Sequence, residues 1–297
     1  MKVNNKKRNE YFWGYLMIAP VTLGLIAFYF YPFFQVIFDS FFKIGAFDRR
    51  QGFVGLDNYK RMLTDAQMWQ TLINTFKYVI IIVPVTVIFS LIIAVLLNTK
   101  IKGLSVFRVV YFLPAITMAA AVSMVWRWIF NGDYGVLNGI LGFFGADPVQ
   151  WLNNKHTALI CVCSVAIWSN VGYYMIILLA GIQGISKEYY EAADMDGATT
   201  FKRFWKITLP LLTPTLFYVV IMIIISTFQT FDGIYLMIGT KSNAIKYTQS
   251  VVMYFYRTAF DYSNKGYASA IAVMLFLIIM IITMFQMKMQ KKWVNYD

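Results

Sequence analysis

Charged residues are scarce in this chain of 297 residues: Asp, Glu, Lys and Arg make up 13% of it, whereas 59% of the residues are hydrophobic. A soluble globular domain usually has about 25% charged and about 45–50% apolar residues. The shortage of charge therefore excludes an ordinary water-soluble protein. Several apolar runs exceed the roughly 18 residues that mark a membrane-spanning helix. The composition predicts an all-α, polytopic membrane protein.

Histidine and cysteine are also scarce, with one and two residues respectively. His156 lies in a polar loop, while Cys161 and Cys163 stand two apart in an apolar run, on different faces of one helix. These residues offer neither a disulfide framework nor a metal site. The chain also lacks the G-x-x-x-x-G-K-[ST] pattern that cradles phosphates, so we expect no ATPase site of that kind. No nucleophile–base pair is visible either, which disfavours a membrane enzyme.

The formal net charge of +12 raises the alternative of nucleic acid binding. A nucleic-acid face requires basic residues in one stripe with interleaved aromatics. Here the basic residues instead lie between apolar runs. We therefore expect no nucleic acid partner and assign the positive charge to the flanks of membrane spans.

Six apolar runs divide the chain, and each is long enough to cross a hydrocarbon core of roughly 30 Å with some tilt. The first is too long for a signal-peptide core and lacks an A-x-A cleavage pattern, so we expect it to remain as a span. Together they define a transmembrane domain over residues 12–287, between tails of residues 1–11 and 288–297. The predicted spans are residues 12–38, 72–97, 106–130, 158–182, 212–236 and 266–287.

Prolines lie inside or at the mouths of several runs. Such helices kink where neighbours satisfy the freed backbone groups, which favours a packed bundle around a cavity. Kinks without function are an equal alternative for any single proline. The prolines concerned are Pro20, Pro32, Pro84, Pro114 and Pro214.

Lysine and arginine residues gather beside alternate ends of the six runs. The side that carries more of them near span ends is predicted to be cytoplasmic, which places both termini in the cytoplasm. Basic residues of the opposite loops are partly offset by acidic ones. The residues that carry this prediction are Lys2, Lys6, Lys7, Arg8, Lys100, Lys102, Lys187, Lys202, Arg203, Lys206, Lys288, Lys291 and Lys292.

The centres of the six runs hold no carboxylate or histidine. Carriers that couple transport to ions or protons usually place such groups at mid-membrane depth. A stand-alone secondary carrier or channel is therefore the weaker alternative, and we expect a partner to supply the energy.

The segment between the fourth and fifth runs is unusually polar. It predicts a short helix capped by Ser186 that ends at or near Gly197, followed by a second helix that breaks at Pro210. Acidic residues gather in its first half and basic residues in its second. Such a helix-turn-helix suits docking in a groove of another protein. The alternative is an amphipathic loop that lies on the lipid surface.

This segment contains E-A-A, three residues, G, nine residues and I-x-L-P, with Glu191-Ala192-Ala193, Gly197 and Ile207-Thr208-Leu209-Pro210. It resembles the cytoplasmic EAA loop of the permease subunits of binding-protein-dependent ABC importers. Further matches resemble the carbohydrate branch of that family, the maltose-type first permease, over roughly residues 10 to 290. They are the segments 53–59, 107–114, 126–135 and 228–232.

The resemblance implies a type I importer permease fold with six transmembrane helices and a coupling loop over residues 186–210. It also implies a heterodimer with a second permease of similar fold, two ATPase subunits and an extracytoplasmic solute-binding protein. This chain would hold no cofactor, because ATP and Mg are bound by the ATPase partners. The coupling residues carried over from the family are Glu191, Ala192, Ala193, Gly197, Ile207, Leu209 and Pro210.

The same resemblance implies a sugar path through the fourth and fifth spans, with Asn170, Tyr173, Ser226, Thr227 and Thr230 at the corresponding positions. Aromatic rings, amides and hydroxyls suit a neutral, hydroxyl-rich solute such as an oligosaccharide. Ordinary helix–helix hydrogen bonding is an alternative role for each of them.

Two departures from the family pattern and one alternative substrate limit what the resemblance implies about the solute. Ser226 and Thr227 replace an aromatic residue and an amide of the maltose permease, so the same sugar is not implied. The fifth outer loop, residues 239–243, lacks the Gly-Gly-Pro run of many relatives, which leaves the contact with the binding protein open. Glycerol phosphate is the alternative substrate, if Arg127 or Lys77 faces the cavity.

Overall fold

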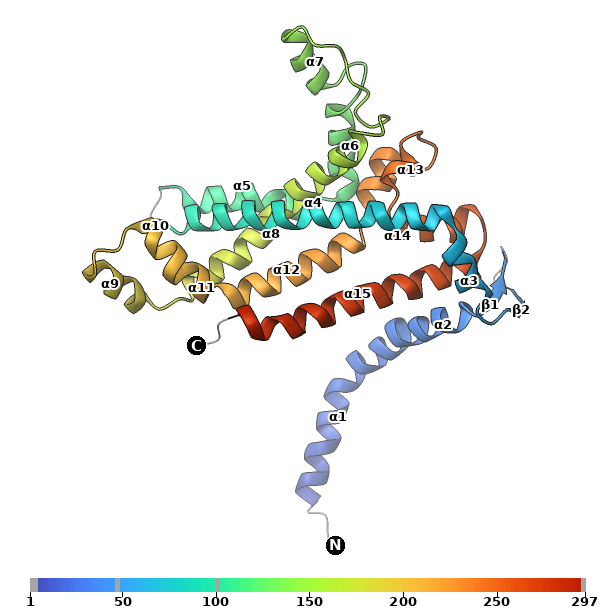
Figure 1. The fold of residues 1–297 in the computed structure, drawn as a ribbon. Coiled ribbons are helices and arrows are strands. Elements are labelled where there is room, and N and C mark those ends of the chain that lie inside the picture. The colour runs from blue at the N-terminus through green and yellow to red at the C-terminus, as the bar shows by residue number, and fades with distance from the viewer. Residues whose placement is uncertain (1–4, 46–48, 100–101, 295–297) are drawn as a thin grey trace. The chain divides into compact units, whose positions relative to one another are not determined.

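The computed structural model describes residues 5–45, 49–99 and 102–294 of the chain (Figure 1). Lys2 and Lys100, which contribute to the predicted orientation, and the last three residues of the predicted C-terminal tail lie outside this part. The chain forms two units by its contacts: residues 1–64 with 255–275, and residues 65–254 with 276–297.

The first unit begins with a long helical segment. It consists of α1 (Asn5–Leu25), the π-helical turn η1 (Ile26–Phe30) and α2 (Tyr31–Asp39), and therefore starts seven residues before the predicted span. In the π turn the N–H of Tyr31 donates to the carbonyl of Ile26. This widened turn stands directly before Pro32, whose ring would clash with the carbonyl of an ordinary α turn.

A small β-hairpin follows α2. The sequence predicted an all-α chain and did not indicate this hairpin. Strands β1 (Phe42–Ile44) and β2 (Arg50–Phe53) pair antiparallel with Phe42 opposite Phe53, and α3 (Asp57–Thr64) comes next. The amide of Asn58 donates to the carbonyls of Ser40 and Phe42 at 2.8 and 3.2 Å. These bonds tie α3 to the hairpin.

The hairpin also contacts the second part of the first unit, which contains the π turn η4 (Arg257–Asp261) and the beginning of α15 (Lys265–Trp293). A Cβ on Gly266 would lie 2.1 Å from the carbonyl oxygen of Phe42, so only glycine permits this approach. The guanidinium of Arg61 lies 4.4 Å from the centre of the Tyr267 ring.

The second unit is built on α4 (Ala66–Leu97) and α8 (Ala158–Gln183), which pack along each other. Helix α4 starts six residues before the predicted span because Asp65 caps it, accepting from the N–H groups of Gln67 and Met68. The hydroxyl of Ser90 donates to the carbonyl of Val171 at 3.0 Å and links the two helices. The buried residues between them include Tyr78, Ala94, Cys163, Met175 and Leu178.

The predicted third span is broken. Helices α5 (Leu104–Ile116) and α6 (Ala119–Ile129) meet at an angle of 96°. Thr117 is extended at the break, and its hydroxyl donates to the carbonyl of Leu113 at 2.8 Å in place of a helical N–H. Two β-branched residues, Ile116 and Thr117, follow Pro114 and disfavour helix, whereas the alanine run after Met118 starts a new one.

The predicted fifth span is bent as well. It is approached by α10 (Thr200–Arg203), η2 (Phe204–Thr208) and α11 (Leu209–Leu211), and α12 (Thr213–Phe228) leaves at 67°. The predicted break at Pro210 is wrong by two residues, because the bend lies at Leu212. Pro214 lacks an N–H, and the hydroxyl of Thr213 bonds the carbonyl of Pro210 at 2.7 Å instead.

The remaining helices shift the other predicted bounds. Helix α12 ends at Phe228, before the polar residues Gln229 and Thr230, and the π turn η3 (Ile234–Ile238) follows. Helix α15 extends six residues beyond the predicted sixth span, so much of the predicted tail is helical. Shorter helices that the sequence did not predict are α7 (Val136–Phe143), α13 (Ile245–Thr248) and α14 (Val251–Tyr256).

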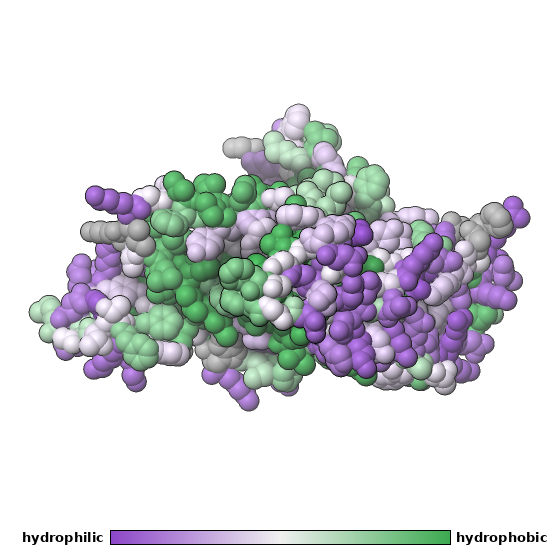
Figure 2. All heavy atoms as spheres, turned by 90° about the horizontal axis from the view of Figure 1, so that it is seen from above, coloured by the Kyte–Doolittle hydropathy of each residue, from purple (hydrophilic) through white to green (hydrophobic). Residues whose placement is uncertain are grey.

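The surface is rich in large apolar side chains. In Figure 2 hydrophobic residues gather in a broad patch on the face that is drawn. Soluble monomers rarely expose such patches. Within the described residues, four helices are long and apolar enough to cross a membrane, or six candidate spans if each bent pair is one.

Candidate functional site

The segment with the E-A-A pattern, here called the EAA loop (residues 186–210), forms two short helical parts. Helix α9 (Lys187–Met195) begins at Ser186, whose hydroxyl accepts from the N–H of Glu188 at 3.4 Å. It ends before Gly197, which has a φ of +69°. The N–H of Ala198 donates to the carbonyl of Ala193 across this turn, as in a glycine-terminated helix. The turn therefore requires glycine.

Side-chain bonds join the two halves of the EAA loop. Arg203 forms an ion pair with Asp194, and the hydroxyls of Tyr190 and Thr208 share a hydrogen bond of 3.0 Å. A third bond caps the second half, where Thr199 accepts from the N–H of Lys202 at 3.3 Å. Helix α9 is thereby fixed to the segment that leads into α12.

The predicted coupling residues lie on two sides of the loop. Glu191, Ala192 and Gly197 are exposed, and Met195 beside them is 91% exposed. The others, Ala193, Ile207, Leu209 and Pro210, are buried or half-buried. Sequence reasoning missed Tyr190 and Arg203 as the residues that join the halves, because nothing in the chain order pairs them with Thr208 and Asp194.

A cavity of about 300 Å³ lies where the break between α5 and α6 meets α8 and the residues after α12. Asn170 and Thr230 both line it, so the structure brings together two of the predicted path residues. The amide nitrogen of Asn170 donates to the carbonyl of Ala166, and the hydroxyl of Thr230 donates to that of Thr227. The amide oxygen of Asn170 can therefore accept from a solute hydroxyl.

Other polar residues of this lining were not predicted as path residues. They are Thr117, Ser123, Ser169 and Asp232, beside apolar residues such as Pro114 and Val162. Among the described residues that line this cavity, Asp232 carries a charge. Ser169 could have been predicted from the sequence, since it precedes Asn170 in a mostly apolar run. Ser123 could not, because it reaches the cavity only through the break at Thr117.

Three predicted path residues lie elsewhere. Tyr173 is on α8 and exposed, with its ring 5.2 Å from that of Tyr174. Ser226 is exposed and donates to the carbonyl of Ile223 at 3.0 Å. Thr227 is 4% exposed and does not reach the cavity. In the isolated chain these three do not share a site with Asn170.

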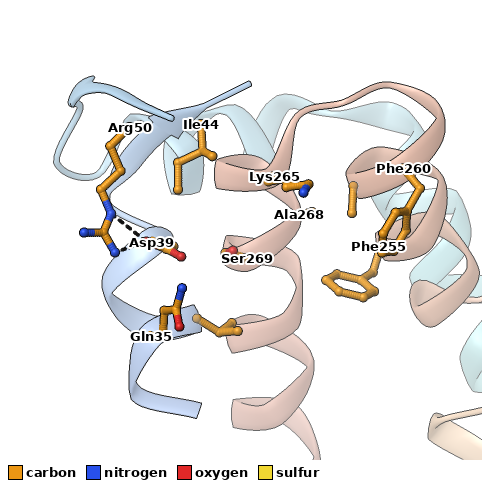
Figure 3. A pocket seen from close by; sticks show the side chains of 11 residues that line it. Gln35, Asp39, Ile44, Arg50, Phe255, Phe260, Lys265, Ala268 and Ser269 are labelled. Atoms are coloured by element: carbon orange, nitrogen blue, oxygen red, sulfur yellow. Dashed lines mark hydrogen bonds and ion pairs between the residues drawn. The ribbon is translucent and has the colours of Figure 1, made fainter. Parts of the chain in front are cut away.

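The first unit has a pocket of about 500 Å³ with both polar and apolar lining residues, shown in Figure 3. Arg50 on the hairpin donates to the carboxylate of Asp39 on α2 at 2.7 and 2.9 Å. Gln35, Lys265 and Ser269 add further polar groups to the lining. The ion pair fixes the hairpin to α2.

Residues 67–296 match the family described as binding-protein-dependent transport system inner membrane component. The chain is 38% identical over 300 residues to the probable ABC transporter permease protein YesP of Bacillus subtilis (strain 168), covering 100% of this chain and 96% of YesP. It is 34% identical over 280 residues to the arabinooligosaccharides transport system permease protein AraP of the same organism, covering 93% of this chain and 87% of AraP.

A solved structure shares the fold. One chain of a bacterial alginate ABC transporter, crystallised with an alginate pentasaccharide-bound periplasmic protein, matches with a TM-score of 0.87 at 19% identity, covering 97% of this chain and 96% of that chain. The resemblance predicted from the E-A-A pattern is thus confirmed by sequence and by fold. The chain belongs to the binding-protein-dependent transport system inner membrane components and is a permease subunit of an ABC importer.

Proposed function

We propose that this permease carries an oligosaccharide or a related polyol across the membrane by alternating access, with energy supplied by ATPase partners. The observation that carries the substrate class is the cavity beside the break in the third span. Its hydroxyl and amide groups bind a hydroxyl-rich solute without the desolvation cost of an ionised group. The name of AraP, a relative that transports arabinooligosaccharides, agrees with this class.

Glycerol phosphate fits the cavity less well. Its phosphate needs a cationic partner, yet the described lining residues include Asp232 and no lysine or arginine. Arg127 and Lys77, the cations that glycerol phosphate would need there, are exposed and do not line the cavity. A carboxylate in the lining repels phosphate, so a neutral solute is favoured.

The EAA loop is the proposed contact with the ATPase partners. Glu191, Ala192 and Gly197 are exposed for docking in a cleft of the ATPase, while Ile207, Leu209 and Pro210 connect the loop to α12. Motion of α9 would reach α12 through the bonds of Tyr190 and Arg203. Alternating access requires that ATP and the loaded binding protein bind the two states of the permease with different affinity.

This proposal places both termini and the EAA loop in the cytoplasm and counts each bent helix pair as one span. The partners are a second permease of similar fold, two ATPase subunits that hold ATP and Mg, and an extracytoplasmic solute-binding protein. This chain itself hydrolyses no ATP.

The substrate class is tested with the assembled transporter in proteoliposomes. Uptake of radiolabelled neutral oligosaccharides is compared with uptake of glycerol phosphate, for the wild type and for Asn170→Leu. We expect sugar uptake by the wild type and a loss of roughly tenfold in Asn170→Leu, which removes one or two hydrogen bonds to the solute. Uptake of glycerol phosphate in preference to every sugar would refute the proposed substrate.

The coupling role is tested by Glu191→Ala, with sugar-stimulated ATP hydrolysis as the readout. We expect stimulation to be lost while the partner subunits still co-purify. Glu188→Ala, which changes another exposed carboxylate on the same helix, is the matched control. Unaltered sugar stimulation of ATP hydrolysis in Glu191→Ala would refute the coupling role of Glu191.

A further inference from the structure

The second half of the EAA loop, α10 with η2 and α11, has the composition of a segment that lies at a membrane surface. Over Thr200–Leu211 it contains Lys202, Arg203 and Lys206 and no acidic residue. Phe201 and Trp205 are exposed, and their rings lie 6.1 Å apart. Basic residues beside exposed aromatic ones are typical of helices at the interface of a bilayer.

An apolar groove of about 390 Å³ adjoins this segment. Every residue of its lining is apolar; Phe204, Trp205 and Leu209 form one wall, and Ile88, Leu91, Ile92, Val95 and Leu96 of α4 form the other. The α4 residues recur at helical spacing and share one face of that helix. A water molecule needs two to four polar partners, which these side chains do not offer. The groove therefore suits a hydrocarbon chain.

The charged residues that lie next to the groove-lining residues in the chain indicate the kind of headgroup. Lys202 and Lys206 are both exposed, whereas Arg203 is engaged by Asp194. The acidic residues of the EAA loop, Glu188 and Glu191 among them, lie in α9 or directly after it, and none lines the groove. An anionic headgroup is attracted to the lysines and repelled from the acidic half.

We propose that this groove binds an anionic phospholipid of the cytoplasmic leaflet, with an acyl chain between α4 and η2 and its phosphate near Lys202 and Lys206. The lipid would hold the second half of the loop at the membrane surface, and α9 would stay joined to that half through the Tyr190–Thr208 and Arg203–Asp194 bonds. The inference rests on the proposed cytoplasmic position of the EAA loop.

The test uses the whole transporter in phosphatidylcholine nanodiscs with a phosphatidylglycerol probe that carries a photoactivatable acyl chain. Peptide mapping after illumination is expected to find adducts on the peptides with Ile92 and Trp205. A phosphatidylcholine probe of the same chain is expected to label them about 25-fold less, since each of the two lysines near the membrane surface favours anionic lipid by a factor of about five.

Variants distinguish the contribution of the lysines, which bind the headgroup, from that of the groove, which binds the acyl chain. The double variant Lys202→Gln with Lys206→Gln is expected to lower phosphatidylglycerol labelling by roughly 25-fold, and Lys187→Gln, on the acidic half, is the matched control. Val95→Trp fills the groove and is expected to abolish labelling. Co-purification of the partner subunits checks that each variant assembles; if Val95→Trp fails to assemble, the lysine variants decide.

Equal labelling by the two probes, unchanged labelling in the double lysine variant, or a cross-link of the groove to a polypeptide would overturn the proposal. The readout needs no transport. Lipid labelling that persists while Glu191→Ala leaves coupling intact would refute the coupling role and keep the lipid site.

Discussion

Gly172 decides how closely two helices approach. A Cβ at this position would lie 1.7 Å from the carbonyl oxygen of Tyr111, so α5 and α8 can meet here only around a glycine. We predict that Gly172→Ala forces the helices apart and lowers the free energy of unfolding by about 1–3 kcal/mol or more. Thermal unfolding of the purified protein in detergent measures this change.

Gly184→Ala is the control for that prediction, since its Cβ would have no neighbour closer than 3.4 Å. Equal midpoints for the two variants would contradict the close approach of α5 and α8.

The two cysteines provide a second prediction at the scale of the residue. Cys161 and Cys163 are free thiols, 3% and 0% exposed, that pack inside the second unit. Because a reagent cannot reach them, we expect maleimide to label neither in the folded protein and both after denaturation. Mass spectrometry counts the adducts, and rapid labelling of the folded chain would show that this packing is wrong.

At the scale of the element, the EAA loop works as one body only if its halves stay joined. Arg203 and Asp194 form an exposed ion pair, worth less than about 1 kcal/mol to stability, so its value is geometric. We predict that Asp194→Arg reduces sugar-stimulated ATP hydrolysis and that adding Arg203→Asp restores most of it. A swap that fails to restore coupling, in a complex that still assembles, would mean that the pair does not join the halves.

The chain order predicted most of this element. The Ser186 cap, the end near Gly197 and the second helix follow from local preferences that each act within a few residues. The bond between Tyr190 and Thr208 and the bend at Leu212 did not follow. The bond depends on how α9 folds back on the next segment, which no local preference describes. The bend arises from Pro214 and the Thr213 hydroxyl, although Pro210 offers the same local signal.

The broken third span shows the same limit. Its apolar run predicts one helix over residues 106–130, yet the chain turns by 96° near Thr117. Hydropathy indicates only that lipid or protein surrounds these residues. It carries no information on the direction of the helix axis. The break matters because it brings Thr117 and Ser123 to the same cavity as Asn170.

At the scale of the whole molecule, the topology is open to a direct test. We predict that a cysteine at Ala146, between α7 and α8, reacts with membrane-impermeant maleimide in intact cells. A cysteine at Lys187, in the EAA loop, should react only after the membrane is permeabilised, because the two sites lie beyond opposite ends of α8, which spans the membrane in the proposed topology. Both residues are exposed, so burial does not confuse the result.

The buried native thiols supply a low background for this labelling. Reaction at position 187 in intact cells would contradict the cytoplasmic loop and, with it, the six-span topology.

The sequence by itself determined the class of the protein, its apolar runs and the family, because hydropathy and a motif of fixed spacing are properties of the chain order. Only the tertiary structure decided which polar residues share a cavity. Asn170 and Thr230 line it and Ser226 and Thr227 do not. Thr230 follows the end of α12, and the break at Thr117 brings residues of α5 and α6 to the same cavity. Local residues favour the break, but where the broken span meets α8 depends on packing between segments far apart in the chain, as at Gly172 and Tyr111, and no local pattern encodes it.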